Sequence, residues 1–374
     1  MRPRSDSGCR RPPRGDRRRV PQSPKATSCS LLGLLLAALL APAPAAAATI
    51  AGGQIVASGI PFATNVTFDR AGGMWVTSGA GERNDADGVW YVPRPGARPR
   101  HVIKGTNRAL GLTWFRKRLY VSSIVSPSTG AVARYSGFDG HRFRYRRYVV
   151  PYLPVRQHTL DSIVPGPNGR LYLGVGSEND NIPSGHRTSG TILSLKPDGS
   201  DLRIEATGVR NPYGLAFIPG TASLLFTDNG RDDLGPNRPP DELNLIRDVT
   251  KAAPDFGFPQ CYDQGGSHCR GTAAPLTLFP PHASSDGLAV TRHWRGGGLT
   301  AFVAENGATI LGASAGNDIR RIALTRLPGG GYRARVSVFA SGFAEHDPLG
   351  AAIGPDGALY VTLFVSGDVI RYAP

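Results

Sequence analysis

Residues 160–177 read LDSIVPGPNGRLYLGVGS, and their pattern decides the fold. A short, mostly apolar segment leads into the turn residues Gly-Pro-Asn-Gly, and a second segment follows in which apolar side chains alternate at a period of two. This pattern predicts two antiparallel strands joined by a tight turn. His158 lies just before the first predicted strand, and the polar run SENDN follows the second.

The same two-strand pattern recurs along the chain, which indicates a repeat architecture. Further copies are NVTFDRAGGMWVTSG from residue 65, ALGLTWFRKRLYVSS from 109, PYGLAFIPGTASLLFTDNG from 212, DGLAVTRHWRGGGLTAFVAE from 286 and PLGAAIGPDGALYVTLF from 348. Their spacing of about 45 to 70 residues suits four strands per copy, and no long amphipathic helix interrupts them. We therefore predict an all-β fold, a six-bladed β-propeller with four-stranded antiparallel blades.

The two ends of the propeller are expected to share a blade. The region from about Ile55 and the terminal stretch DVIRYAP both have strand character. Pairing them would close the ring and remove exposed strand edges. Residues 49–374 are thus predicted to form one propeller domain.

Residues 1–48 lack the two-strand pattern and have the composition of a targeting segment. Nine Arg or Lys residues precede the apolar run LLGLLLAALLA, and small residues ending in APAAAA come next. This order is typical of a cleaved signal sequence, and the apolar run is too short for a membrane span. We expect an exported protein, periplasmic or secreted, with no stable membrane insertion.

Without the leader, the chain keeps 34 basic and 26 acidic residues, a net charge of about +8. The arginines are scattered, and nucleic-acid binding is not expected because it requires a basic stripe or patch. Two of the four cysteines, Cys261 and Cys269, remain, and in an exported chain they predict a disulfide around the loop CYDQGGSHC. A metal site that also uses His268 is the less favoured alternative.

Several motifs together resemble the glucose/sorbosone dehydrogenase family, particularly its L-sorbosone dehydrogenase-like branch. They are RQHTLDSIVPGPNGRLYLGVGS, GVRNPYGLAF, FTDNGRDDLGPNRPPDELNLI and DFGFPQCYD, and the resemblance extends over most of residues 60–372. It implies a six-bladed propeller that oxidises an aldose sugar or sugar aldehyde with pyrroloquinoline quinone (PQQ), usually with Ca²⁺. An electron acceptor of unknown identity would complete the reaction.

The resemblance also implies roles for individual residues. His158 corresponds to the general base, which would take the proton of the sugar C1 hydroxyl group. Arg210 and Asn211, in VRNPYG, correspond to cofactor-binding residues. Gly230 and Arg231, in DNGRDD, correspond to positions whose backbone carbonyls hold Ca²⁺.

The sequence lacks basic residues that are usual in the family at positions expected to bind the cofactor. Asp161 stands where a basic residue is usual, and no arginine precedes the final GPDG turn. PQQ carries three carboxylates, whose burial without cationic partners is costly. Candidate replacements are four arginines of the fifth repeat: Arg292, Arg295, Arg320 and Arg321.

Three functions are therefore weighed. The first is an exported quinoprotein dehydrogenase. The second is a non-catalytic propeller that binds carbohydrate or protein, because a fold does not dictate its function. The third and weakest is a calcium-dependent lactonase, with Asp161, Asp228 and Asp286 as the carboxylates of its metal site. His282 and His346, which also precede predicted inner strands, are expected to be structural.

Overall fold

The structure is a computed structural model that describes residues 49–79, 86–262, 267–291, 298–310 and 313–373. The predicted leader, residues 1–48, lies outside the described residues, as do Arg292 and Arg295. In the described part of the chain, the only helical element is the short 3₁₀ turn η1 (Ser267–Cys269). No helix there has the length and apolar character needed to cross a bilayer.

Six antiparallel sheets make up the described residues, apart from a small hairpin of β21 (Ala308–Ile310) and β22 (Ala313–Ala315). Blade 1 contains β3 (Ala63–Phe68), β4 (Met74–Ser78), β5 (Gly88–Val92) and β6 (Arg100–Lys104). Blade 2 contains β7 (Gly111–Phe115), β8 (Arg118–Ser126), β9 (Thr129–Phe138) and β10 (Phe143–Pro154). Blade 3 contains β11 (Leu160–Pro165), β12 (Leu171–Val175), β13 (Thr191–Leu195) and β14 (Arg203–Ala206).

The remaining blades follow the same order. Blade 4 contains β15 (Leu215–Phe217), β16 (Leu224–Asp228), β17 (Pro240–Ile246) and β18 (Thr277–Pro281). Blade 5 contains β19 (Ser285–Val290), β20 (Gly298–Glu305), β23 (Asp318–Arg326) and β24 (Tyr332–Ser341). Blade 6 contains β25 (Pro348–Ile353), β26 (Leu359–Leu363) and β27 (Asp368–Tyr372), joined by β2 (Gly53–Ala57) and β1 (Thr49–Ile50).

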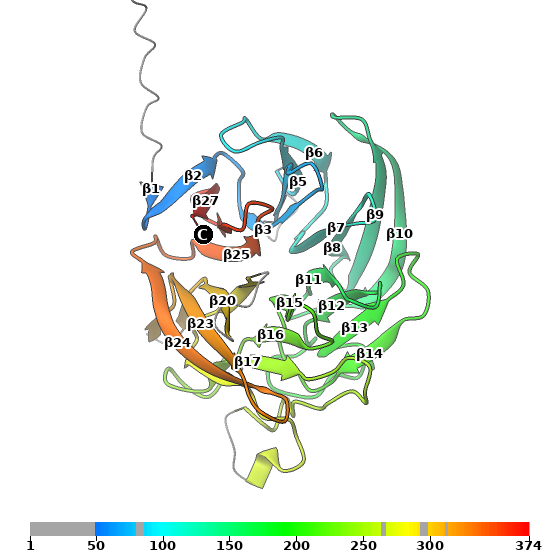
Figure 1. Cartoon of the computed structure of the whole chain (residues 1–374). Helices are drawn as coiled ribbons and strands as arrows, with labels where there is room; N and C mark the ends of the chain where they lie inside the picture. Colours follow the sequence, from blue (N-terminus) through cyan, green and yellow to red (C-terminus); the bar gives the residue numbers. More distant parts are fainter. Residues whose placement is uncertain (1–48, 80–85, 263–266, 292–297, 311–312, 374) are drawn as a thin grey trace, which may run out of the picture. The chain divides into compact units, whose positions relative to one another are not determined.

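The blades are arranged in a ring, as Figure 1 shows for the sheets coloured from blue to red. The first strands of successive blades, β3, β7, β11, β15, β19 and β25, contact one another in turn, and β25 contacts β3. These are therefore the inner strands, and the loops at their ends surround the central channel. The prediction of a six-bladed propeller is confirmed.

The ring closes through the two ends of the described chain. The N-terminal strand β2 pairs with β27, with Gln54 opposite Arg371 and Ile55 opposite Ile370. The Tyr372 hydroxyl also donates a hydrogen bond to the Ala51 carbonyl at 3.2 Å. This pairing confirms the expected closure by the two terminal segments, and it gives β27 a partner on its outer side.

Apolar side chains fill the spaces between the sheets. Strands β4, β12, β16 and β26 are buried at every residue, and both faces of these strands are mostly apolar, with Asp228 at the end of β16 as a buried exception. Trp75 is fully buried and packs against the rings of Tyr91, Trp114 and Phe138. The resulting rigid scaffold holds the channel-facing loops in fixed positions.

Candidate active site

A cavity of about 310 Å³ lies at the mouth of the channel, where the loops before the inner strands meet. It is lined by Gly79, Arg108, Leu110, Gln157, His158, Thr159, Asp161, Asn211, Tyr213, Leu349 and Phe364. The volume falls at the lower end of the range usual for small-molecule sites, about 300 to 1,000 Å³. Of the predicted site residues, His158 and Asn211 line this cavity together.

Backbone hydrogen bonds fix His158 just before β11. Its N–H donates to the Ser177 carbonyl at 3.2 Å, and its own carbonyl accepts from Arg156 N at 3.2 Å. Ser177 N in turn donates to the Arg210 carbonyl at 2.7 Å. The histidine, the SENDN segment and the VRNPYG segment are thereby joined, as the predicted site requires.

Gly176 lets His158 and Asn211 come close to each other. A Cβ atom on this glycine would lie 2.3 Å from the Cβ of His158 and 3.2 Å from Oδ1 of Asn211. The first distance is a clash, so any larger residue would displace the histidine. The glycine after β12 therefore supports the site by leaving space.

The His158 imidazole has an unusual environment. Its Nε2 is shielded from solvent and has no hydrogen-bond partner among the described residues. Burial, reinforced by the positive charge of Arg210, lowers the pKa of His158 well below its ordinary value of 6.5. The ring is therefore neutral at neutral pH.

Arg210 is buried, and its guanidinium group is already paired. Its Nε donates to Asp180 Oδ1 at 3.0 Å, and its Nη2 lies against the same Asp180 oxygen and 2.9 Å from Asp232 Oδ2. Its Nη1 donates to the Asn229 carbonyl at 3.1 Å. The carboxylates of Asp180 and Asp232 therefore offset the positive charge of Arg210. In the family resemblance, that charge would interact with the quinone.

Asn211 is held through its backbone. Its N–H donates to Asp228 Oδ1 at 2.6 Å, and its carbonyl accepts from Tyr213 N at 2.9 Å. These contacts leave the side chain at the cavity wall, where an amide can donate and accept at once. The predicted cofactor contact of Asn211 is therefore sterically reasonable and stays a prediction.

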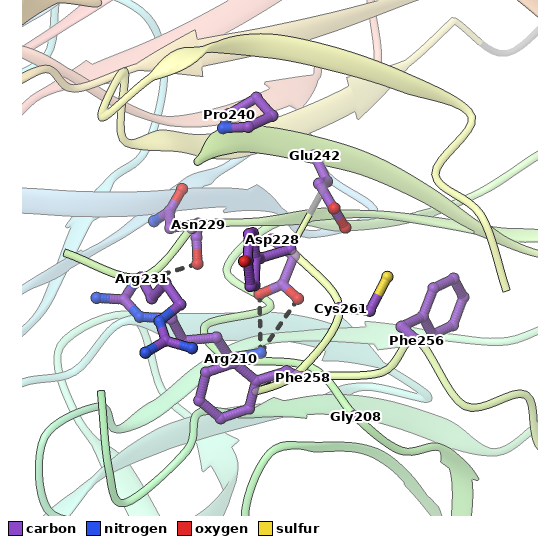
Figure 2. A pocket seen from close by; sticks show the side chains of 12 residues that line it. Gly208, Arg210, Asp228, Asn229, Arg231, Pro240, Glu242, Phe256, Phe258 and Cys261 are labelled. Carbon is purple, nitrogen blue, oxygen red and sulfur yellow. Dashed lines mark hydrogen bonds between the residues drawn. The ribbon is translucent and has the colours of Figure 1, made fainter. Parts of the chain in front are cut away.

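Gly230 and Arg231 line a second, much smaller hollow of about 20 Å³, shown in Figure 2. This volume suits about one water molecule or small ion. Gly230 N donates to Asp241 Oδ1 at 2.9 Å, and the Arg231 side chain is paired with Asp233 and the Pro259 carbonyl. The carboxylates of Asp228 and Glu242 also line the hollow. Within the described residues, no group of three or more His, Cys, Asp or Glu side chains could hold a metal.

Three buried carboxyl groups lie on strands of three successive blades, Asp161 on β11, Asp228 on β16 and Asp286 on β19, and the first of them lines the cavity. Burial, together with the charges of Asp286 and Asp228, raises the pKa of Asp161 well above its ordinary value. Burial also raises the pKa of Asp228 to about 7 and that of Asp286 to about 7. At neutral pH these groups therefore hold protons for much of the time. Asp161 Oδ2 has no hydrogen-bond partner in the described structure.

The other candidate residues occupy structural positions. His282 Nε2 lies 2.9 Å from the Gly235 carbonyl, and His346 Nδ1 lies 3.0 Å from the Gly307 carbonyl. Arg320 is paired with Glu305 and Asp318, at 2.8 and 2.9 Å. Arg321 lines a separate hollow beside Phe302 and Phe339, away from the His158 cavity.

Cys261 and Cys269 form the predicted disulfide. It closes the insertion that follows DFGFPQ, and Tyr262 within this insertion lies under the guanidinium groups of Arg231 and Arg238. The insertion therefore packs against the DNGRDD loop. His268 stacks on the Tyr262 ring, at 5.0 Å between centroids.

We expect replacement of both cysteines by alanine to lower the free energy of unfolding by about 2 to 3 kcal/mol, because the short loop gains conformational freedom when the chain unfolds. Urea unfolding of the two proteins under oxidising conditions measures this difference. An unchanged midpoint and slope would show that the insertion opens independently of the propeller.

Sequence analysis did not identify Arg108, Gln157 or Tyr213 as cavity residues, or Asp180 as the partner of Arg210. Asp180 lies in the polar SENDN segment that follows the second predicted strand of this blade. Arg108 lies in the loop before β7 with a positive φ of 43°. No local sequence pattern marks that residue.

No family model matches the chain. An uncharacterized protein of Borreliella burgdorferi is 26% identical over 205 residues, which are 53% of this chain and 51% of that protein. The chain therefore spans about half the length of the curated relative it matches.

Solved structures with the same fold include several sugar dehydrogenases. The holo PQQ domain of pyranose dehydrogenase from Coprinopsis cinerea has a TM-score of 0.69 at 17% identity, covering 85% of this chain and 94% of that one. The PQQ-bound aldose sugar dehydrogenase from Streptomyces coelicolor has a TM-score of 0.66 at 20% identity, with coverages of 85% and 96%. The apo form of the soluble aldose sugar dehydrogenase from Escherichia coli has a TM-score of 0.61 at 17% identity, with coverages of 85% and 98%. The chain thus has the propeller fold of these dehydrogenases, in keeping with its sequence resemblance to the glucose/sorbosone dehydrogenase family.

Proposed function

We propose that the protein is an exported quinoprotein dehydrogenase that oxidises an aldose sugar or sugar aldehyde. The observation that carries the proposal is the unpartnered, shielded Nε2 of His158 beside a cavity at the channel mouth. A buried side-chain nitrogen in a purely structural position would normally have a hydrogen-bond partner. The dehydrogenase fold of the neighbours supports the same reading.

His158 is suited to accept a proton. Because burial and Arg210 keep its pKa well below 6.5, the imidazole is neutral at pH 7 and accepts the proton of a sugar hydroxyl group at Nε2. The environment disfavours the imidazolium ion, so proton uptake would have to accompany hydride loss from the sugar, and the proton would then be released to solvent water. PQQ, when bound, would supply the two-electron acceptor for the accompanying hydride.

The cavity offers a partial match to that cofactor. Arg108 and Asn211 would hold it, the first as the one guanidinium among the described lining residues and the second as an amide. Backbone oxygens of Gly230 and Arg231, with the nearby Asp228 and Glu242 carboxylates, are the kind of donors that Ca²⁺ prefers. The donor types therefore fit PQQ in part, with fewer cations than three carboxylates would use, whereas Arg210 and Arg231 also line the smaller hollow and the described residues offer no group of three acidic or histidine ligands for Ca²⁺.

One observation favours the second candidate, a propeller that binds carbohydrate or protein without redox chemistry. Arg210 is neutralised by Asp180 and Asp232, and Arg320 is neutralised by Glu305 and Asp318. A propeller that binds carbohydrate or protein without PQQ does not require unpaired guanidinium groups to hold the carboxylates of that cofactor. The two candidates differ in whether sugar reduces a bound quinone.

Reconstitution distinguishes them. The purified protein is incubated with PQQ and Ca²⁺, freed of unbound cofactor, and its absorbance spectrum is recorded before and after addition of aldoses. We expect the spectrum of the reduced quinone to appear, and to fail to appear when chelator replaces Ca²⁺. Retention of cofactor without any reduction by a panel of aldoses and sugar aldehydes, or no retention at all, would instead support the binding module.

Export is proposed together with this function. The order of charged, apolar and small residues in positions 1–48 supports it, as does the Cys261–Cys269 disulfide, which suits an oxidising compartment.

A further inference from the structure

A groove of about 900 Å³ lies next to the His158 cavity, between blades 1 and 2. Its lining residues include Asp87 before β5, Asn107 and Arg108 in the loop before β7, Arg146 and Tyr148 on β10, and Arg156 before β11. Arg108 lines both hollows, so the two adjoin at this residue. The volume is at the upper end of the range for small-molecule sites, about 300 to 1,000 Å³.

The charge of this groove is one-sided. Three guanidinium groups, those of Arg108, Arg146 and Arg156, line it, and within the described part of the chain none of them is in a salt bridge. Among the described lining residues, the one acidic side chain is that of Asp87, which is 1% exposed and whose Oδ2 lies 3.3 Å from the backbone N of Arg108. Elsewhere in the site, by contrast, Arg210 and Arg231 are paired with carboxylates.

The groove also has features that suit a sugar. The Arg146 guanidinium lies 4.6 Å from the centre of the Tyr148 ring and 5.9 Å from that of Tyr135, which holds it over aromatic faces. Tyr148 is 39% exposed, so part of its ring is open to a ligand. Asn107 Oδ1 is shielded from solvent and has no hydrogen-bond partner among the described residues, so it could accept from a sugar hydroxyl group if the side chain turned toward the groove.

We propose that the groove binds the non-reacting part of an acidic oligosaccharide substrate, one built of hexuronate units, whose reacting end enters the His158 cavity. Carboxylates would pair with Arg146 and Arg156, and sugar hydroxyl groups would meet Asn107 and the aromatic ring. Arg108 lies where the groove adjoins the His158 cavity, because it lines both. This inference rests on the proposed dehydrogenase function for the reacting end, whereas the binding of the acidic part stands on the groove alone.

Binding is tested first, without cofactor or turnover. Titration calorimetry at low salt compares a trigalacturonate with maltotriose, a neutral sugar of the same length. We expect the acidic trisaccharide to bind at least about tenfold more tightly, with the difference shrinking at 1 M salt. Equal affinity for the two sugars would overturn the proposal.

A matched pair of double variants locates the site. R146Q/R156Q should weaken trigalacturonate binding by about tenfold or more, since it removes two charge-assisted contacts. R333Q/R335Q removes the same charge from exposed positions on β24 of blade 5 and should leave affinity unchanged. An equal loss in both would mean that only the overall charge matters, and the groove would be rejected.

Turnover separates this inference from the proposed function. In the reconstituted protein, R146Q/R156Q should raise KM for the acidic sugar while kcat stays the same, because the groove binds ground state and transition state alike. If trigalacturonate binds as expected but no sugar reduces the cofactor, the groove is supported and the dehydrogenase is refuted. If neutral aldoses are oxidised while trigalacturonate fails to bind, the reverse holds.

Discussion

Replacing His158 with alanine is expected to lower the turnover of the reconstituted protein by about 10² to 10⁴, with cofactor retention nearly unchanged. A general base acts in the transition state and contributes little to ground-state affinity, so the loss should fall on kcat. Stopped-flow reduction of the bound cofactor by a saturating sugar measures it. The alanine variant also keeps the backbone hydrogen bonds that fix this segment, since they involve only main-chain atoms.

His346→Ala is the matched control. His346 also precedes an inner strand, β25, but its Nδ1 is already hydrogen-bonded to the Gly307 carbonyl. Its removal should leave turnover unchanged. Equal turnover in His158→Ala and the parent would rule out His158 as the base.

The pH profile gives an independent check. Since the pKa of His158 is lowered well below 6.5, the parent should be fully active at neutral pH and should lose activity only on the acid side of that value, as the imidazole is protonated. In His158→Ala, the residual activity should lack this acid limb. A parent profile that falls with a midpoint above 6.5 would contradict the lowered pKa.

The fold could be predicted from the sequence because each blade is built from local contacts. A turn such as GPNG determines the pairing of the strands on either side, and β11 and β12 pair as the pattern predicts. Closure between β2 and β27 joins the two ends of the propeller, and it was predictable only because both segments had strand character and six copies demanded a ring. The extra strand β1 was not predicted.

The site was less predictable because its contacts are long-range. The pairing of Arg210 with Asp180 and Asp232 joins blade 3 to blade 4 across loops, and loop conformation leaves little periodicity in a sequence. The approach of His158 to Asn211 depends on Gly176, whose role becomes clear only when both neighbours are placed. The resemblance identified these residues, but their partners required the structure.

One signal for the buried carboxyl groups was present in the repeats. Asp161 and Asp286 are each the second residue of an inner strand, in LDSI of β11 and SDGL of β19. Equivalent positions in a propeller lie at the same height around the axis, so these two aspartates had to approach each other in the channel. Asp161, first noted as a departure from the family, is thus part of this buried set.

The second large effect is expected at Asp286, where asparagine should stabilise the protein at high pH. Asp286 is 3% exposed, and burial raises its pKa to about 7. A carboxyl group whose pKa is higher in the folded than in the unfolded state favours folding less and less as pH rises above the unfolded value of 3.8. Between that value and 7 the cost amounts to about 4 kcal/mol. Asparagine does not titrate, so the variant avoids this cost.

Asparagine also preserves the local contacts of Asp286. Its Oδ1 can still accept from Asn229 Nδ2, now at 2.8 Å, and its amide can donate to the Ser284 hydroxyl group, which lies 2.8 Å from Oδ2. We therefore expect little change in the free energy of unfolding at pH 4 and an increase of up to about 4 kcal/mol at pH 8. Urea unfolding from pH 4 to pH 8 measures both.

Asp201→Asn provides the control of opposite sign. A hydrogen bond from Arg203 keeps the pKa of Asp201 below its ordinary value, so this carboxylate favours folding at pH values above its unfolded pKa. Its replacement should leave the protein no more stable, or slightly less stable, at pH 8. If Asp286→Asn instead destabilises the protein at pH 8, the carboxyl group is ionised and matched by a cation in the channel, and the assignment of a protonated Asp286 is wrong. If both variants stabilise equally, the effect comes from the loss of one carboxylate at any position, and burial of Asp286 in the channel has no special part in it.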